Sequence, residues 1–336
     1  MNLSEYRSLC PLCLKKVGEE KELCPNCQGS LGSENQPHQL AVGSALGGKY
    51  YVGRAMEEST QSITYIGLDL TKNQKVMIKE FYPRKNALRQ ADGYTVVPNE
   101  EMNGAYSEYS FHEGKAYFKE RIRNLAFFRR CKGIAAFLED FEENGTVYKV
   151  TEYEEGVTLS RAFEKRGAPF PADELLMLLE PVFMAVNAFN EEHIVHGGIS
   201  PDTILVTEDG ARLLDFADEV TQKGNKTRNS SYLAPEQITD TYPGVDSWTD
   251  IYSLAAVFYR GITGNPPLNA GNRAGWDNMQ VPTELNKQIS IHIENAVLKG
   301  LSVNPSRRYK KASRFYDDLV SAAVEPVHIE ARTRFL

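Results

Sequence analysis

Hydrophobic residues follow two different spacings along the chain, and the change between them divides the sequence into two parts. Before about residue 153 short apolar runs predominate; residues 63–68 and 75–81 are two of them, joined by a polar turn that contains Asn73. Short runs rich in β-branched and aromatic residues, bounded by turn residues, predict strands. From Pro171 onward apolar residues recur at helical spacing. The pattern therefore predicts a β-rich amino-terminal part and a helical carboxy-terminal part.

Two further features are expected within the β-rich part. Residues 136–141 and 146–150 flank a turn whose Asn144-Gly145 pair is typical of a tight β-hairpin. One helix interrupts the strands. It is indicated by three apolar residues at helical spacing, Phe118, Ile122 and Leu125.

The helical part contains two segments with different patterns. The first has one apolar stripe, formed by Leu175, Leu179, Val182, Val186 and Phe189. Such a stripe is typical of a helix that buries one face in a core, and we favour this over a ligand-binding face. The second segment, residues 248–262, is apolar on nearly every side, which predicts a helix buried within the larger part.

The composition is that of a globular protein. The chain has 336 residues, of which 41% are hydrophobic and 25% charged. Its longest apolar run, around residues 175–189, is interrupted by Glu180 and is too short to span a bilayer. No charged-then-apolar signal peptide opens the chain, so we expect a cytoplasmic protein without membrane insertion. The net charge of −7 argues against a nucleic-acid partner, because phosphate affinity needs a basic face.

Four of the five cysteines form two pairs near the amino terminus. Cys10 and Cys13, then Cys24 and Cys27, give C-x2-C, ten residues, C-x2-C. Four thiolates from two such knuckles suit a closed tetrahedral zinc site, and the metal would supply the folding energy of so small a segment. The alternative, disulfides or redox dithiols, is disfavoured in a cytosolic chain. We therefore expect a structural zinc ribbon over residues 1–30.

The rest of the amino-terminal region is less informative. Basic and acidic residues balance in the expected ribbon, which favours a structural or protein-contacting role over nucleic-acid binding. Residues 31–44 are rich in Gly, Ser and polar residues, and they indicate a linker. Cys131 stands alone and indicates a buried or partly buried thiol.

Six segments after the linker match motifs of one known family. Residues 196–206 resemble the catalytic loop H-R-D-x-x-x-x-N, and residues 75–81 resemble the strand V-A-I-K, with Lys79 as the phosphate-contacting lysine. The other four follow in family order. Residues 213–217 resemble D-F-G, and residues 234–236 match A-P-E. Residues 250–254 resemble D-x-Y-S-L, which opens a buried helix, and residues 304–309 resemble a late segment that carries an arginine. The chain resembles a bacterial serine/threonine protein kinase.

This resemblance implies an α+β fold of two lobes, a small β-rich lobe and a large helical lobe, preceded by the zinc ribbon. The implied boundaries are a kinase-like domain at 45–325, with a small lobe at 45–151, a hinge at 152–156 and a large lobe at 157–325, and then a tail at 326–336. Residues at scaffold positions of the family are kept, namely His196, Asp250, Glu236 and Arg308. In the family, the arginine of the late segment pairs with the A-P-E glutamate.

The positions that carry the family's chemistry are altered. Gly198 replaces the aspartate that accepts the substrate hydroxyl proton, and Thr203 replaces the asparagine that holds a magnesium ion. Glycine has no side chain that accepts a proton. Three loop glycines, which let backbone N–H groups approach phosphates closely, are replaced by Glu57, Ser59 and Ser62.

Four residues are expected at the nucleotide pocket. Lys79 and Asp215 are kept, and Glu152 and Glu154 fall in the hinge. The resemblance implies residual nucleotide or metal binding by Lys79 and Asp215; the alternative is a structural ion pair made by Lys79. Because the glycine loop is lost, we expect binding of ATP and magnesium to be weak or absent.

These departures predict that the chain is not an enzyme but a pseudokinase, a scaffold or allosteric regulator in bacterial phosphorylation signalling. Loss of a general base alone typically lowers a rate by about 10²–10⁴-fold. The expected partners are proteins: an active kinase, a phosphatase or a substrate. The alternative is an enzyme with altered nucleotide chemistry, an unconventional kinase or nucleotidyl transferase, that uses Lys79 and Asp215.

Overall fold

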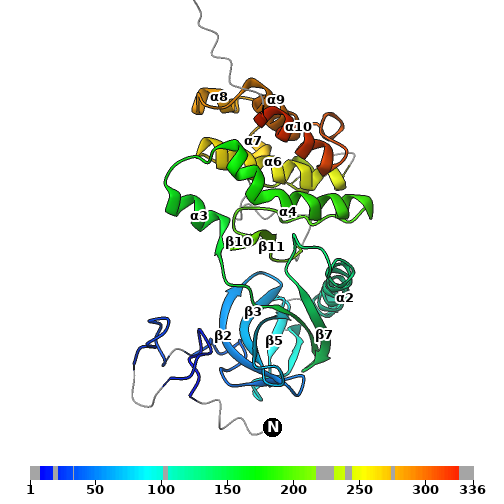
Figure 1. Cartoon of the computed structure of the whole chain (residues 1–336). Helices are drawn as coiled ribbons and strands as arrows, with labels where there is room; N and C mark the ends of the chain where they lie inside the picture. The colour runs from blue at the N-terminus through cyan, green and yellow to red at the C-terminus, as the bar shows by residue number, and fades with distance from the viewer. Residues whose placement is uncertain are drawn as a thin grey trace, which may run out of the picture. The chain divides into compact units, whose positions relative to one another are not determined.

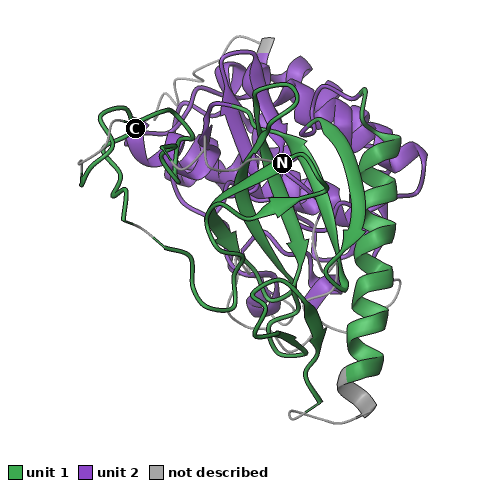
Figure 2. Cartoon of the chain, turned by 90° about the horizontal axis from the view of Figure 1, so that it is seen from below, with its two compact units in different colours: residues 1–130, 136–154 green, residues 131–135, 155–336 purple. Residues whose placement is uncertain are grey.

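The computed structural model of the chain describes residues 8–17, 22–32, 34–100, 105–216, 231–238, 244–273 and 277–324. The chain divides into two compact units, residues 1–130 with 136–154, and residues 131–135 with 155–336 (Figure 2). We call the first the small lobe, which includes the amino-terminal segment, and the second the large lobe. Within the described part of the chain, no helix combines the length and apolar content needed to cross a membrane.

One antiparallel sheet of six strands, in the order β1-β2-β3-β4-β8-β7, forms the centre of the small lobe (Figure 1). Its strands are β1 (Ala45–Leu46), β2 (Tyr50–Glu58), β3 (Ser62–Asp69), β4 (Gln74–Phe81), β7 (Phe137–Glu143) and β8 (Thr146–Glu152). The described part of the lobe also contains a short ladder of β5 (Ala87–Arg89) and β6 (Val96–Pro98) and the helix α2 (Ala105–Phe127).

The predicted elements of the small lobe are confirmed. Strands β3 and β4 are joined by a turn in which Asn73 has a φ of 54°. Asn144 and Gly145 have φ values of 54° and 76°, as a tight hairpin turn of this type requires. Phe118 of α2 is buried, and its ring centroid lies 5.5 Å from that of Phe81 on β4. The helix is therefore packed onto the sheet by its predicted apolar face.

A three-stranded sheet and a set of helices form the large lobe. The strands, in the order β11-β10-β9, are β9 (Val157–Thr158), β10 (Ile204–Thr207) and β11 (Gly210–Leu213). The helices are α3 (Leu159–Arg166), α4 (Ala172–Glu191), α5 (Pro235–Ile238), α6 (Ser247–Thr263), α7 (Ala270–Arg273), α8 (Pro282–Leu285), α9 (Ile291–Gly300) and α10 (Ala312–Val324), with a 3₁₀ turn η2 (Pro305–Arg307) before α10.

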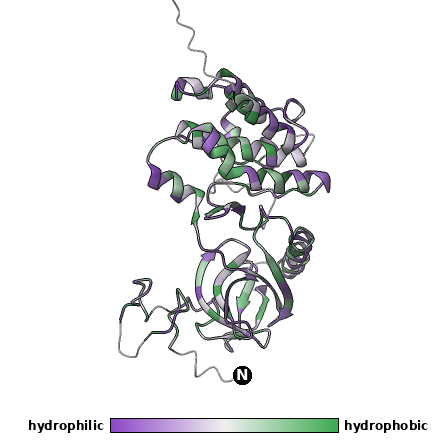
Figure 3. Ribbon diagram, viewed as in Figure 1, coloured by the Kyte–Doolittle hydropathy of each residue, from purple (hydrophilic) through white to green (hydrophobic). Residues whose placement is uncertain are grey.

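Helices α4 and α6 confirm the two predicted helical segments. All five residues of the predicted stripe on α4 are fully buried. Helix α6 begins at a capping box made by Asp246 and Thr249, and it ends at Gly264, whose φ is 80°. Figure 3 shows hydrophobic and polar residues interspersed along the helices and strands of each lobe.

Candidate functional site

The turn between β2 and β3 stands where the resemblance puts the phosphate-binding loop, and one hydroxyl group closes it. Ser59 Oγ accepts hydrogen bonds from the backbone N–H groups of Gln61 (3.1 Å) and Ser62 (3.0 Å). It also lies 3.0 Å from Ser62 Oγ. The Ser59 N–H donates to the Ser62 carbonyl oxygen at 2.8 Å. Backbone donors that a phosphate group would use are therefore bonded within the turn itself.

The tip of this turn is also tied to the segment that follows β4. The Tyr82 N–H donates to the Gln61 carbonyl oxygen (2.8 Å), and the Arg84 N–H donates to that of Thr60 (3.1 Å). Glu57, another predicted glycine replacement, is exposed on β2 opposite Thr64. The turn is thus fixed at its tip by two backbone hydrogen bonds, while Glu57 adds negative charge on its surface.

Glu58, at the end of β2, binds residues of the predicted linker. Its Oε2 atom lies 3.0 Å from both His38 Nε2 and Gln39 Nε2, and Arg84 Nη1 lies 3.3 Å from its Oε1 atom. Desolvation would raise the pKa of Glu58, but the hydrogen bonds from His38 and Gln39 outweigh it, and the pKa is lowered. The linker segment is therefore fastened to the phosphate-loop hairpin by an ionised carboxylate.

The residues predicted for nucleotide binding are divided between the two lobes. Lys79 lies on β4, opposite Thr64 of β3 and Lys149 of β8, and its side chain is half-buried. Glu152 is exposed at the end of β8, and Glu154 is half-buried after it. These residues belong to the small lobe and Asp215 to the large lobe. Their assignment to one nucleotide site stays a prediction.

In the large lobe, the catalytic-loop segment is held by buried Asp250. The carboxylate oxygens of Asp250 accept hydrogen bonds from the N–H groups of His196 (2.7 Å) and Gly197 (2.9 Å). Gly197 has a φ of 78°, whereas Gly198 lies outside the positive-φ region. The Gly197 carbonyl oxygen accepts from Gln237 Nε2 at 2.8 Å. The hydrogen bonds that hold the loop backbone are therefore present next to Gly198, which has no side chain.

Thr203 occupies the metal-binding asparagine position, and its hydroxyl group turns back into the loop. Thr203 Oγ1 donates to the Gly198 carbonyl oxygen (2.7 Å) and accepts from the Ser200 N–H (2.9 Å). The Leu214 N–H donates to the Thr203 carbonyl oxygen at 2.9 Å. This bond extends the β10–β11 ladder, so the backbone entering Asp215 is fixed beside Thr203. Asp215 itself is half-buried.

The predicted scaffold pair, Glu236 and Arg308, is confirmed. Arg308 Nη1 and Nη2 lie 2.7 and 2.9 Å from the two carboxylate oxygens of Glu236, and both side chains are fully buried. Arg308 also donates to the carbonyl oxygens of Trp248 (3.1 Å) and Ser302 (2.7 Å). A planar, bidentate pair with further acceptors satisfies both buried charges.

The four amino-terminal cysteines form a candidate metal centre. Their Sγ atoms all lie within 4.8 Å of one another, and the pairs Cys10–Cys27 and Cys13–Cys24 are 3.7 Å apart. Thiolates at about 2.3 Å from a tetrahedral zinc ion would be about 3.8 Å apart, whereas a disulfide bond is about 2.05 Å long. Desolvation would raise the pKa of Cys24, but the N–H groups of Cys27 and Asn26 outweigh it and lower the pKa to about 6. The donor set fits a metal ion and is not disulfide-bonded.

The two cysteine knuckles repeat the same backbone conformation. In the first, the Leu14 N–H donates to the Cys10 carbonyl oxygen at 2.9 Å; in the second, the Gln28 N–H donates to that of Cys24 at 2.8 Å. Leu14 and Gln28 have φ values of 57° and 62°. Each knuckle therefore turns at the residue after its second cysteine, which directs the four thiols inward.

A buried polar cluster around Glu80 was not anticipated from the sequence. The fully buried Glu80 carboxylate accepts hydrogen bonds from Arg89 (2.7 Å), Tyr65 (2.9 Å) and Tyr148 (2.9 Å). Burial and the adjacent carboxylate raise the pKa of both tyrosines, so they stay protonated donors. Tyr65 Oη in turn accepts from the Leu40 N–H at 3.0 Å. In the sequence, this cluster is indicated only by the charged Glu80 within the apolar segment 75–81.

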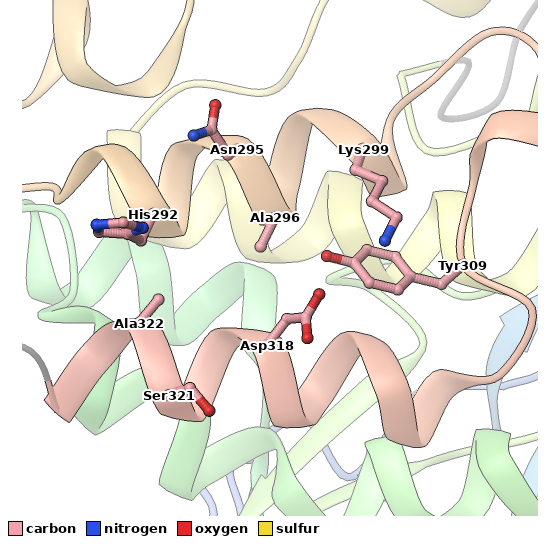
Figure 4. A pocket seen from close by; sticks show the side chains of 8 residues that line it. All are labelled: His292, Asn295, Ala296, Lys299, Tyr309, Asp318, Ser321 and Ala322. Carbon is pink, nitrogen blue, oxygen red and sulfur yellow. The ribbon is translucent and has the colours of Figure 1, made fainter.

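A shallow pocket of about 290 Å³ lies between α9 and α10, and Tyr309, the last residue of the late arginine segment, is part of its lining (Figure 4). Lys299 Nζ stands 3.9 Å from the centre of the Tyr309 ring. Burial and a hydrogen bond to Asp318 raise the pKa of Tyr309. Lys299, Tyr309 and Asp318 thus interact with one another in this pocket.

Comparison with known proteins gives the family. The chain matches the protein kinase domain family over residues 107–322. It is similar to the serine/threonine-protein kinase PknB of Mycobacterium leprae, with 29% identity over 188 residues, which are 52% of this chain and 30% of that protein. A "probable serine/threonine-protein kinase" of Clostridium acetobutylicum is 24% identical over 294 residues, which are 83% of this chain and 40% of that protein. The chain thus spans less than half the length of these relatives.

Solved structures show the same fold. The structure titled "PpkA-294 apo form" has a TM-score of 0.70 and 28% identity, and the match covers 84% of this chain and 99% of that one. The PknI kinase domain of Mycobacterium tuberculosis has a TM-score of 0.62 at 18% identity, with the same coverage, and this likeness shows the fold alone. The predicted two-lobed, kinase-like α+β fold is confirmed, and the cysteine cluster is consistent with the predicted ribbon.

The prediction that the chain is not an enzyme is wrong. The relatives it matches are named serine/threonine-protein kinases, and these names point to an enzyme. Gly198 and Thr203 remove two contributions to catalysis, but phosphoryl transfer depends chiefly on positioning and charge neutralisation, so these replacements do not by themselves exclude activity. The predicted tail at 326–336 and Ala217, the last residue of the D-F-G-like segment, lie outside the described residues.

Proposed function

Because this chain belongs to the protein kinase family, we propose that it is an unconventional kinase, which transfers a phosphoryl group from a nucleoside triphosphate to a protein hydroxyl group. The observation that carries the proposal is the position of Asp215. Its backbone is fixed beside Thr203 by the Leu214 N–H, at the edge of a loop that Asp250 holds in place. The resemblance assigns metal binding to a carboxylate at this position, and the supported backbone favours that role for Asp215.

The chemistry suits a catalytic loop without its own base. The transition state of phosphoryl transfer is loose, so the protein contributes mainly positioning and charge stabilisation. Lys79 would contact the phosphates, and Asp215 would hold magnesium, which supplies neutralisation of the developing charge. Since Gly198 offers no proton acceptor, the rate should be about 10²–10⁴-fold below that of a relative with a base. We therefore expect slow transfer.

The proposed metal of the ribbon is zinc in a structural role. Four thiolates at tetrahedral spacing form a closed donor set, which leaves no ligand position for catalysis. The proposed partners are proteins of bacterial phosphorylation signalling, as substrates or regulators.

A second candidate function is regulation of another kinase or of a phosphatase through direct binding. It is favoured by the closed phosphate turn, in which Ser59 occupies the backbone donors. This function and slow transfer are compatible, because a kinase-like surface binds partners whether its turnover is fast or slow.

The test is incorporation of labelled γ-phosphate into the chain itself and into general protein substrates, with ATP and magnesium or manganese. We expect slow incorporation by the wild type and none by Lys79→Met or Asp215→Asn. Thermal melting of all three proteins establishes that the variants are folded. Equal signals in the wild type and both variants would contradict the proposal.

A further inference from the structure

The outer edge of β2 is covered in part by the first cysteine knuckle. Among the described residues, β1 pairs with β2 only at Tyr50 and Tyr51. Farther along the strand, the Arg54 N–H donates to the carbonyl oxygen of Pro11, 2.8 Å away. An open sheet edge readily pairs with another segment. Here the first cysteine knuckle pairs with this part of the β2 edge.

Gly53 permits this close approach. A Cβ atom at Gly53 would lie 2.8 Å from the Pro11 carbonyl oxygen and 2.9 Å from that of Ile66, closer than real Cβ contacts. Asn35 bonds the same stretch of β2, since its Oδ1 accepts from the Ala55 N–H (2.9 Å) and its Nδ2 donates to the Gly53 carbonyl oxygen (3.1 Å). The strand is therefore shaped to receive the amino-terminal segment.

Apolar side chains reinforce the contact. One buried cluster joins the first knuckle to the face of β2 and β3, and its members are Leu9, Leu14, Tyr51, Ile66 and Leu68. Leu9 and Leu14 are 8% and 6% exposed. In the second knuckle, the residue equivalent to Leu9 is Leu23, which is 55% exposed. The first knuckle is thus docked on the small lobe, and the second lies at the surface.

We propose that metal binding by the four cysteines clamps the first knuckle onto β2 and thereby sets the stability of the phosphate-loop hairpin β2–β3. Pro11 lies between Cys10 and Cys13, and Leu14 follows Cys13, so the groups that contact β2 are ordered by the metal ligands. A segment of this size lacks a core of its own, and without metal its fold is lost. Binding energy at the cysteines then appears as stability of the strand they hold. The clamp does not depend on phosphoryl transfer.

The test compares amide hydrogen exchange of the full chain with about one zinc ion bound and after removal of zinc by a chelator. Loss of zinc should speed exchange of the Arg54 amide by about tenfold to a hundredfold, the equivalent of losing about one buried leucine side chain. Exchange in α9 and α10 of the large lobe should not change. The measurement needs no enzymatic activity, so its outcome is separate from that of the phosphoryl-transfer assay.

One variant separates docking from metal binding. Leu14→Gln introduces the residue found at the equivalent place of the second knuckle, Gln28, where φ is nearly the same. We expect it to keep zinc and lose protection at Arg54, whereas Leu23→Ala on the exposed knuckle keeps both. The proposal is overturned if the chain binds no zinc, if Arg54 stays protected without zinc, or if Leu14→Gln exchanges as slowly as the wild type. Faster exchange throughout both lobes would indicate global unfolding and would also overturn it.

Discussion

The catalytic loop of the large lobe and the phosphate hairpin of the small lobe are supported in different ways. In the large lobe the loop is held by Asp250, a scaffold position of the family, whose carboxylate accepts hydrogen bonds from the N–H groups of His196 and Gly197. In the small lobe the β2–β3 hairpin has lost the family's glycines, and its tip is closed by Ser59. Its outer edge is covered by an added segment at Pro11.

The comparison separates residues that hold the backbone in place from residues at positions where the family resemblance predicts substrate contact. Arg308 and Glu236 form a fully buried ion pair, and the neighbouring Gln237 donates a hydrogen bond to the Gly197 carbonyl oxygen of the loop. The β2–β3 hairpin is held by Ser59 within its turn and by backbone hydrogen bonds from Tyr82 and Arg84 to its tip. Its outer edge is held by the hydrogen bond between Arg54 and Pro11.

The largest expected effect comes from restoring a carboxylate to the intact loop. Gly198→Asp places a proton acceptor at a backbone position outside the positive-φ region. We expect the rate of phosphoryl transfer to rise by about 10²–10⁴-fold. Asp209→Asn, in the exposed β10–β11 turn, should leave the rate unchanged. A Gly198→Asp rate equal to that of the wild type would show that the frame does not present residue 198 to an acceptor.

Removing the scaffold pair should damage the large lobe most. Arg308→Ala leaves the fully buried Glu236 carboxylate without its partner, and we expect a loss of about 3–5 kcal/mol in the free energy of unfolding. The control, Arg314→Ala, breaks a pair with Asp317 at 3.8 Å whose side chains are 71% and 59% exposed, and it should cost less than about 1 kcal/mol. Urea unfolding measures both. Similar losses would contradict the assigned role.

The two knuckles offer a matched pair in the small lobe. Leu9→Ala removes a docked side chain and should cost about 2–3 kcal/mol. Leu23→Ala removes its exposed equivalent and should cost less than about 0.5 kcal/mol. Both are compared by urea unfolding of zinc-saturated protein. A larger loss of unfolding free energy in Leu23→Ala than in Leu9→Ala would contradict the docking of the first knuckle on the small lobe.

The smallest effect is expected at the tip of the hairpin. Ser59→Gly removes the hydroxyl group that competes with phosphate for backbone N–H groups, and one hydrogen bond is worth about 1 kcal/mol. Affinity for ATP with magnesium, measured by calorimetry, should rise by about fivefold. Thr60→Gly adds the same backbone freedom but keeps Ser59, and its affinity should match the wild type. Weaker binding by Ser59→Gly would contradict the competition.

Most of the fold could be predicted from local patterns. The stripe from Leu175 to Phe189 and the Asn144-Gly145 turn each report a constraint that lies within a few residues of the chain. The contacts of the predicted linker could not be predicted in this way. Leu40 bonds Tyr65, and Asn35 bonds Gly53, through single side chains or backbone groups that leave no periodic pattern.

The candidate sites divide along the same line. The cysteine cluster was predictable, because a metal imposes fixed spacing on its ligands. The closure of the turn by Ser59 was not, since its hydroxyl group acts through a geometry that only the folded hairpin supplies. The prediction of no enzymatic activity rested mainly on Gly198 and was wrong. The loss of one side chain removes one contribution to the reaction rate, and the other contributions remain.

The central claim, that this kinase-family chain transfers phosphate with Lys79 and Asp215, is tested most directly by a single-turnover assay with γ-labelled ATP and an excess of the purified chain. The account predicts slow, metal-dependent appearance of label on protein in the wild type, with none in Lys79→Met above the rate of a boiled sample. Label that appears equally in both proteins, or in neither, would contradict it.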